Sequence, residues 1–151
     1  MNDNIFSKAV KENFSFLITE YGYNIIQENY QPETMGNALV VFASRYTIFK
    51  IVQDRGQVLI NIGEASMPRT EWFEFTDVIR FFSFDETLDV YQFSSINPYD
   101  LPPIKEQVSR LAKLTRKYCT PILEGDFSMK QKIKELEKKR TDKLFNELGK
   151  K

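Results

Sequence analysis

The hydrophobic positions of this chain recur with two different periods, and each period predicts a different kind of element. From residue 5 to residue 18 they recur mainly every three or four positions. This predicts an amphipathic helix, which Asp3 or Asn4 can cap and Gly22 can end. From residue 23 to residue 63 aromatic and β-branched residues predominate between short polar segments, which predicts an antiparallel sheet of about four strands.

Two of the predicted strands meet at Asp54, Arg55 and Gly56. We expect a three-residue hairpin loop with Gly56 in the left-handed conformation, because glycine has no Cβ to clash at positive φ. Asp54 and Arg55 then either complete a plain turn or form a charged contact point at the edge of a binding surface. The sequence leaves both interpretations open.

Helical patterns return after residue 70. We predict a short helix over about residues 76–83, a strand or irregular segment at residues 86–93, and a longer helix that Asp100 caps. Prolines lie in the first turn of that helix, Pro121 kinks or ends it, and Gly125 closes the segment. A last helix, about residues 128–148, is highly charged with a thin hydrophobic stripe, so it must dock on the body, pair with another copy or fray.

Together these elements predict an α+β fold with helices packed on one face of the sheet and a charged C-terminal helix. Residues 1–126 form a single domain, and residues 127–151 form a helical extension. A chain of 151 residues that is 42% hydrophobic is long enough for one core. Because it shows no secretory signal, no long apolar run and only one cysteine, Cys119, we expect a cytoplasmic protein without membrane contact.

Charge divides the chain into two parts, although the net charge is zero. Residues 1–126 hold 12 Lys and Arg against 17 Asp and Glu, a net charge of −5. Residues 127–151 hold nine against four, a net charge of +5. An acidic body and a basic tail indicate partners or self-contacts that depend on electrostatics.

The residues that the chain lacks exclude several kinds of catalytic site. It has no histidine, which removes Ser-His, Cys-His and His-metal mechanisms. Its turns contain single glycines and form no phosphate-binding loop, and the segment after Asp54 lacks the Glu-x-Lys element of one class of nuclease. We interpret Cys119 as a structural thiol. Although carboxylate pairs remain possible on composition, we predict a non-enzymatic protein with no cofactor and no metal.

An acidic segment from Glu64 to Asp100 carries eight carboxylates and two arginines, with aromatic side chains between them. Aromatic anchors beside complementary charge give protein interfaces affinity and fast association. This pattern predicts a site for a basic protein partner, unless the aromatics belong to the core and the acids form a solvated face. The candidate partner-binding residues are Asp54, Arg55, Trp72, Glu74, Asp85, Glu86 and Asp89.

The basic C-terminal segment suggests a second kind of partner, because lysine and arginine contact phosphates without recognising sequence. Four acidic residues interrupt the run, and pairs such as Glu135–Lys139 are spaced for contacts along one helix. A solvated or coiled helix therefore explains the same pattern. The candidate nucleic-acid-binding residues are Lys134, Lys138, Lys139 and Arg140.

Four stretches, "YGYNI", "MGNALVVFASRYTIFKIVQDRGQVLINIG", "EWFEFTDVIRFF" and "ILEGDFS", fall roughly within residues 15–128. In them the sequence resembles a family of small uncharacterised bacterial cytoplasmic proteins, some of which look like immunity or antitoxin partners of bacterial toxins. The resemblance lies in the order of elements and in similar turn sequences, and it includes no catalytic motif. It implies a small α+β protein that acts by binding. Since many toxic nucleases are basic, an acidic partner can occupy their substrate groove, by analogy.

We therefore expect a non-enzymatic protein-binding module, of the immunity or antitoxin kind, that occludes a basic partner through an acidic surface. One alternative is a nucleic-acid-associated accessory protein that uses the basic C-terminal helix. Another is a structural oligomer built on that helix.

Overall fold

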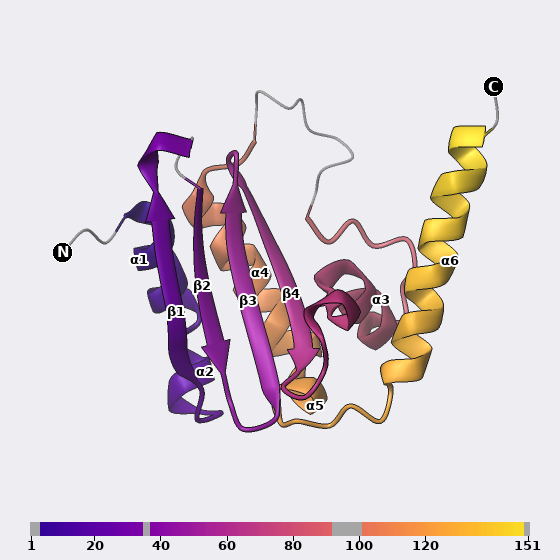
Figure 1. Ribbon diagram of the computed structural model, residues 1–151, viewed down its shortest axis with the longest axis horizontal. Helices are drawn as coiled ribbons and strands as arrows, with labels where there is room; N and C mark the ends of the chain where they lie inside the picture. The colour runs from indigo at the N-terminus through magenta and orange to yellow at the C-terminus, as the bar shows by residue number, and fades with distance from the viewer. Residues whose placement is uncertain (1–3, 35–36, 92–100, 150–151) are drawn as a thin grey trace.

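A computed structural model describes residues 4–34, 37–91 and 101–149 of the chain. Its centre is one antiparallel sheet in the order β1-β2-β3-β4-β5 (Figure 1). The expected α+β class is confirmed, and the expected sheet of about four strands has four long strands and a two-residue fifth. The strands are β1 (Asn24–Gln31), β2 (Asn37–Ala43), β3 (Thr47–Asp54), β4 (Gln57–Glu64) and β5 (Phe73–Glu74).

Helices precede and follow the four long strands. Two 3-10 turns, Pro32–Thr34 and Arg69–Glu71, lie between strands. The helices are α1 (Ile5–Asn13), α2 (Ser15–Thr19), α3 (Phe75–Ser83), α4 (Ile104–Tyr118), α5 (Thr120–Leu123) and α6 (Lys130–Gly149).

The predicted N-terminal helix is divided in two at Phe14, which has φ −104° and ψ 14°. Asn4 caps α1, because its side chain accepts a hydrogen bond from the Ser7 N–H at 2.9 Å, whereas Asp3 lies outside the described residues. Phe14 is fully buried, and its ring centroid lies 5.6 Å from that of Phe49. The helix is therefore interrupted where this ring enters the core.

The β3–β4 hairpin closes with two residues, not with the three expected from the sequence. Asp54 pairs with Gln57, so Arg55 and Gly56 form the loop, with φ of 50° and 85°. A type I′ turn requires positive φ at both central positions, and its twist matches that of the flanking strands. The Arg55 N–H donates to the side chain of Asn37 at 3.0 Å, which helps to hold this turn.

The later helices follow the predicted pattern with shifted ends. Pro103 occupies the N-cap of α4, so the prolines precede the first turn, and the predicted cap Asp100 lies outside the described residues. Pro121 lies in the first turn of α5, directly after α4 ends. Gly125 then takes a φ of 89° where a Cβ would approach Tyr46 to 2.8 Å, so glycine is required there. Residues 86–91 are irregular.

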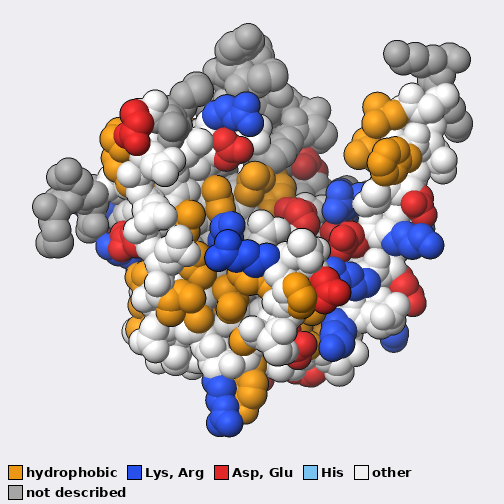
Figure 2. Space-filling model, viewed as in Figure 1, with side chains coloured by type: hydrophobic (Ala, Val, Ile, Leu, Met, Phe, Trp, Pro, Cys, Tyr) orange, Lys and Arg blue, Asp and Glu red, His pale blue; other side chains and the backbone are white. Residues whose placement is uncertain are grey.

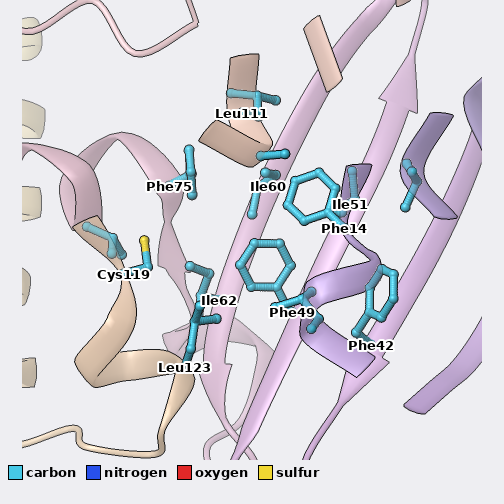
Figure 3. Close-up of a cluster of buried hydrophobic side chains, with 14 of the residues drawn as sticks. Phe14, Phe42, Phe49, Ile51, Ile60, Ile62, Phe75, Leu111, Cys119 and Leu123 are labelled. Atoms are coloured by element: carbon cyan, nitrogen blue, oxygen red, sulfur yellow. The ribbon is translucent and has the colours of Figure 1, made fainter. Parts of the chain in front are cut away.

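The core lies between the sheet and the helices α1 and α4, which cover one of its faces (Figure 1). Inward-facing side chains of the central strands meet Phe14, Leu111 and Leu123 from the helices (Figure 3). The buried hydroxyls have partners, because Tyr23 donates to the Leu123 carbonyl and Thr47 to the Ile122 carbonyl, both at 2.9 Å. These contacts tie the α5 region to the sheet.

Candidate protein-interaction surfaces

The acidic segment and the basic C-terminal helix, which look like two separate binding surfaces in the sequence, contact each other. The first half of α6 lies against α3, and Ile133 is fully buried there (Figure 1). Part of the opposite charge of the body and the tail is thus neutralised within one chain. The ion pairs that join α6 to the body are Arg140–Asp77 at 2.8 Å, Lys139–Glu86 at 3.0 Å and Lys130–Glu64 at 3.6 Å.

Asp77 and Arg140 form the central contact of this interface. The Asp77 side chain is 1% exposed, and its two oxygens accept hydrogen bonds from Arg140 Nε and Nη2, each at 2.8 Å. A bidentate contact of this kind is the strong form of an arginine–carboxylate pair. Hydrogen bonding to Asp77 raises the pKa of Arg140. Since a buried carboxylate without a partner is costly, Arg140 fixes α6 on α3.

Three of the four candidates for nucleic-acid contact are engaged by atoms of the protein itself. Lys134 Nζ donates to the backbone carbonyl of Glu71, and Lys139 and Arg140 hold the carboxylates named above. Lys138 is exposed, and among the described residues it has no ion pair. The basic side of α6 therefore mainly contacts the acids of its own chain.

Glu74, a partner-binding candidate, has a structural role at the start of α3. One of its oxygens accepts a hydrogen bond from the Thr76 N–H at 2.7 Å, and the other accepts one from the Tyr91 hydroxyl. Burial, and then the neighbouring Glu74 carboxylate, raise the pKa of Tyr91 well above its usual range. The Tyr91 hydroxyl also accepts from the Ile60 N–H at 3.1 Å, so it attaches the segment after α3 to β4.

Of the other acidic candidates, Asp85 and Glu86 line one open pocket with Lys139, and Asp89 does not line it. Asp85 is exposed, and the hydroxyl and N–H of Thr87 donate to it at 2.7 and 3.0 Å, which lowers the pKa of Asp85. Glu86 pairs with α6. Asp89 accepts a hydrogen bond from Arg110 of α4 through its backbone carbonyl at 3.2 Å. Asp85 is therefore held within its own loop, Glu86 by α6 and Asp89 by α4.

The hairpin candidates Asp54 and Arg55 pair with each other, with Arg55 Nε 3.2 Å from Asp54 Oδ1. Their side chains are 41% and 72% exposed, and an exposed ion pair of this kind contributes little to stability. The Arg55 backbone is held by the turn itself. This geometry favours a plain turn, and it does not test whether the pair contacts a partner.

The second half of α6 extends beyond α3 (Figure 1). Its apolar side chains Leu144, Phe145 and Leu148 are 52%, 68% and 66% exposed, and we call them the α6 tip. Hydrophobic atoms gather at this end of the helix in Figure 2. Residues three apart are neighbours on a helix, so Asp142 lies beside Phe145 and Glu147 lies beside Leu144. The α6 tip is therefore an apolar cluster flanked by carboxylates.

The face of the sheet that α1 and α4 leave uncovered is also largely apolar. Cross-strand register places Leu39, Val52 and Leu59 in one row on this face. An antiparallel sheet with a solvated face usually carries polar side chains on it, whereas here hydrophobic atoms spread over the strands (Figure 2). We define the open face as the half-buried residues Leu39, Ile48, Lys50, Val52, Leu59 and Asn61 together with Val41, which is only 5% exposed; Lys50 is its one cation.

Trp72, another partner-binding candidate, lies at the border of the open face. Gly63 pairs with Ile48, and a Cβ on Gly63 would overlap the Trp72 ring. The indole N–H donates to the Met67 carbonyl at 3.2 Å, which fixes the half-buried ring. The pattern of aromatic and acidic residues thus indicated one side chain near this surface but missed the surface itself.

A buried thiol and a cavity are the remaining places where chemistry can be sought. Burial raises the pKa of the Cys119 thiol far above its usual range, so it stays protonated. A cavity of about 230 Å³ lies between β4 and α4; of its polar lining residues Tyr91, Glu106, Gln107 and Arg110, the side chains of Gln107 and Arg110 bind backbone groups. In the described ranges no three Cys, Asp or Glu side chains come together to hold a metal ion. Nor does any helix there have the length and apolar character to cross a membrane.

Comparison with known proteins adds no relative. No protein-family model matches the chain, and no curated protein or solved structure matches it. The resemblance to immunity or antitoxin proteins therefore stays a prediction.

Proposed function

We propose that this protein is a non-enzymatic protein-binding module that contacts its partner through the open face of the sheet. One observation carries the proposal: the strands β2, β3 and β4 place apolar side chains on both faces, while α1 and α4 cover only one. Large apolar patches are uncommon on monomeric proteins and mark interaction sites. Strands with two apolar faces are typical of a sheet that is covered on both sides.

The acidic surface expected from the sequence has less support as the place of contact. Asp77, Glu86 and Glu64 already pair with α6, and a basic partner at that place would have to displace the helix. Of the expected immunity or antitoxin function, we retain one part: the protein binds and occludes a partner without catalysing a reaction. The nucleic-acid alternative loses support for the same reason, because most of its candidate cations are paired.

Affinity capture with the tagged full chain tests the proposal. We expect the Leu59→Glu variant to lose a captured protein, because it places a charge in an apolar contact. The triple variant Asp85→Ser, Glu86→Ser, Asp89→Ser retains it. Lys113→Gln, on the exposed side of α4, makes the same change of net charge as Leu59→Glu, −1, and serves as its control.

If the partner is lost only with the triple variant, the contact surface is the acidic segment and not the open face. If Leu59→Glu retains the partner as well as the unmodified chain does, the open face is not the contact surface. The circular dichroism and unfolding midpoint of each variant establish that the fold is kept.

A further inference from the structure

We infer that the partner of the open face is a second copy of this chain, which docks its α6 tip there. This inference rests on the proposed function and names the occupant of the proposed surface. The chain carries two apolar surfaces on which no described helix packs, the half-buried side chains of the open face and the exposed side chains of the α6 tip. The open face and the α6 tip each provide an apolar surface that the other can cover.

The charges of the two surfaces are complementary. On the open face, Lys50 lies between Val41 and Asn61 in the cross-strand register, and among the described residues its ammonium has no ion pair. On the α6 tip, Asp142 and Glu147 flank the apolar side chains. A tip laid on the open face therefore buries apolar surface and gives Lys50 a carboxylate, which is the arrangement that fixes orientation at protein interfaces.

The tip cannot reach the open face of its own chain while α6 stays docked. Ile133 and the Arg140–Asp77 pair hold the first half of α6 against α3, and the helix continues unbroken to Gly149. The tip consequently stands apart from the sheet (Figure 1). Contact between these two surfaces is therefore contact between molecules.

A reciprocal dimer satisfies both surfaces at once. Each chain donates one tip and one open face, so the assembly closes with two equivalent contacts. Three side chains are a small contact compared with the roughly 1,200 Å² that a specific interface buries. When each of two chains places its tip on the open face of the other, the buried contact is doubled. This favours a closed dimer over an assembly with one tip docked.

The first test is the molar mass of the full chain by light scattering over a range of concentrations. We expect a dimer whose dissociation constant rises at least about tenfold in Phe145→Glu and in Lys50→Glu, by loss of an anchor or of a charge pair. Phe145 is 68% exposed, so its replacement does not threaten the body. Lys113→Glu makes the same change of charge as Lys50→Glu, but on α4, and should leave the dimer intact.

The second test mixes the two variants. Phe145→Glu keeps its open face and Lys50→Glu keeps its tip, so the mixture regains one native contact and should associate more tightly than either variant alone, though less tightly than the unmodified chain. Reversing both signs, with Lys50→Glu, Asp142→Lys and Glu147→Lys in one chain, restores the homodimer. A dimer that survives Lys50→Glu overturns the inference, and if the same dimer is lost in Phe145→Glu, the tips pair with each other.

Failure of this inference is separable from failure of the proposed function. A full chain that is monomeric at every concentration excludes the second copy as the partner. If a different protein is then captured and lost in Leu59→Glu, the open face remains the binding surface. If neither dimer nor capture depends on the open face, both statements fall.

Discussion

The two halves of α6 belong to one continuous helix, yet they relate to the rest of the molecule in opposite ways. The first half is docked on α3, with Ile133 buried and Arg140 bound to Asp77. The second half carries more large apolar side chains but leaves them exposed. Hydrophobicity alone therefore does not decide which half is docked. Contact with α3 decides it, because Ile133 and Arg140 meet α3 whereas the second half extends beyond that helix.

We expect the largest difference in stability between the two halves when the buried side chain of Ile133 is removed. Ile133→Ala should lower the free energy of unfolding by about 2 kcal/mol or more, through lost burial and the cavity that remains. Leu148→Ala removes a similar side chain that is 66% exposed, so we expect a change below about 0.5 kcal/mol. Urea unfolding of both variants measures the difference. Equal effects would show that the two halves of α6 are held alike.

A smaller effect is expected from the ion pair that fixes the first half. Arg140→Ala leaves Asp77 buried without its partner. Because the Arg140 side chain is 37% exposed, water screens part of the loss, and we expect about 1–2 kcal/mol. The matched control is Lys138→Ala, which removes an exposed cation from the same helix.

Adding Asp77→Ala to Arg140→Ala should recover part of that loss, since the unpaired charge is then removed as well. Denaturant midpoints of the single and double variants check this. If Arg140→Ala costs no more than Lys138→Ala, the ion pair does not fix α6.

The smallest effect is a dependence on pH that reports on the body and not on α6. Burial raises the pKa of Cys119, so the folded chain keeps a proton that the unfolded chain loses above a pH of about 8.5. Stability therefore falls as pH rises through that region, by at most about 1.4 kcal/mol per pH unit for this group. Cys119→Ala should make the slope of unfolding free energy shallower between about pH 8.5 and 9.5, where arginine stays charged. If the slope of unfolding free energy against pH is the same in Cys119→Ala, Cys119 is not the group responsible for it.

Periodicity was enough to predict the elements whose patterns are long. The β3 and β4 strands and the α4 helix follow from the order of apolar residues. The break at Phe14 did not follow, because it depends on Phe49, far away in the chain. The two-residue strand β5 is too short to show a period, and it exists because Phe73 pairs with Ile62 of β4.

The surfaces were harder to predict than the fold. Asp77 and Arg140 lie 63 positions apart, and equal and opposite net charges of body and tail were the one signal that they meet. The open face had a clearer signal: Ile48 and Val52 alternate in β3 with Phe49 and Ile51, so both faces of that strand are apolar. A strand of that kind predicts that something covers each side.

Trp72 gives this molecule a built-in optical reporter. It is the single tryptophan of the chain, and its half-buried ring lies against Gly63 at the border of the open face. A molecule that settles on that face removes water from beside the indole, and the emission spectrum of the unlabelled protein should move to shorter wavelength. Titrating the chain by dilution, or with any purified partner, would then follow occupancy of the surface by fluorescence alone.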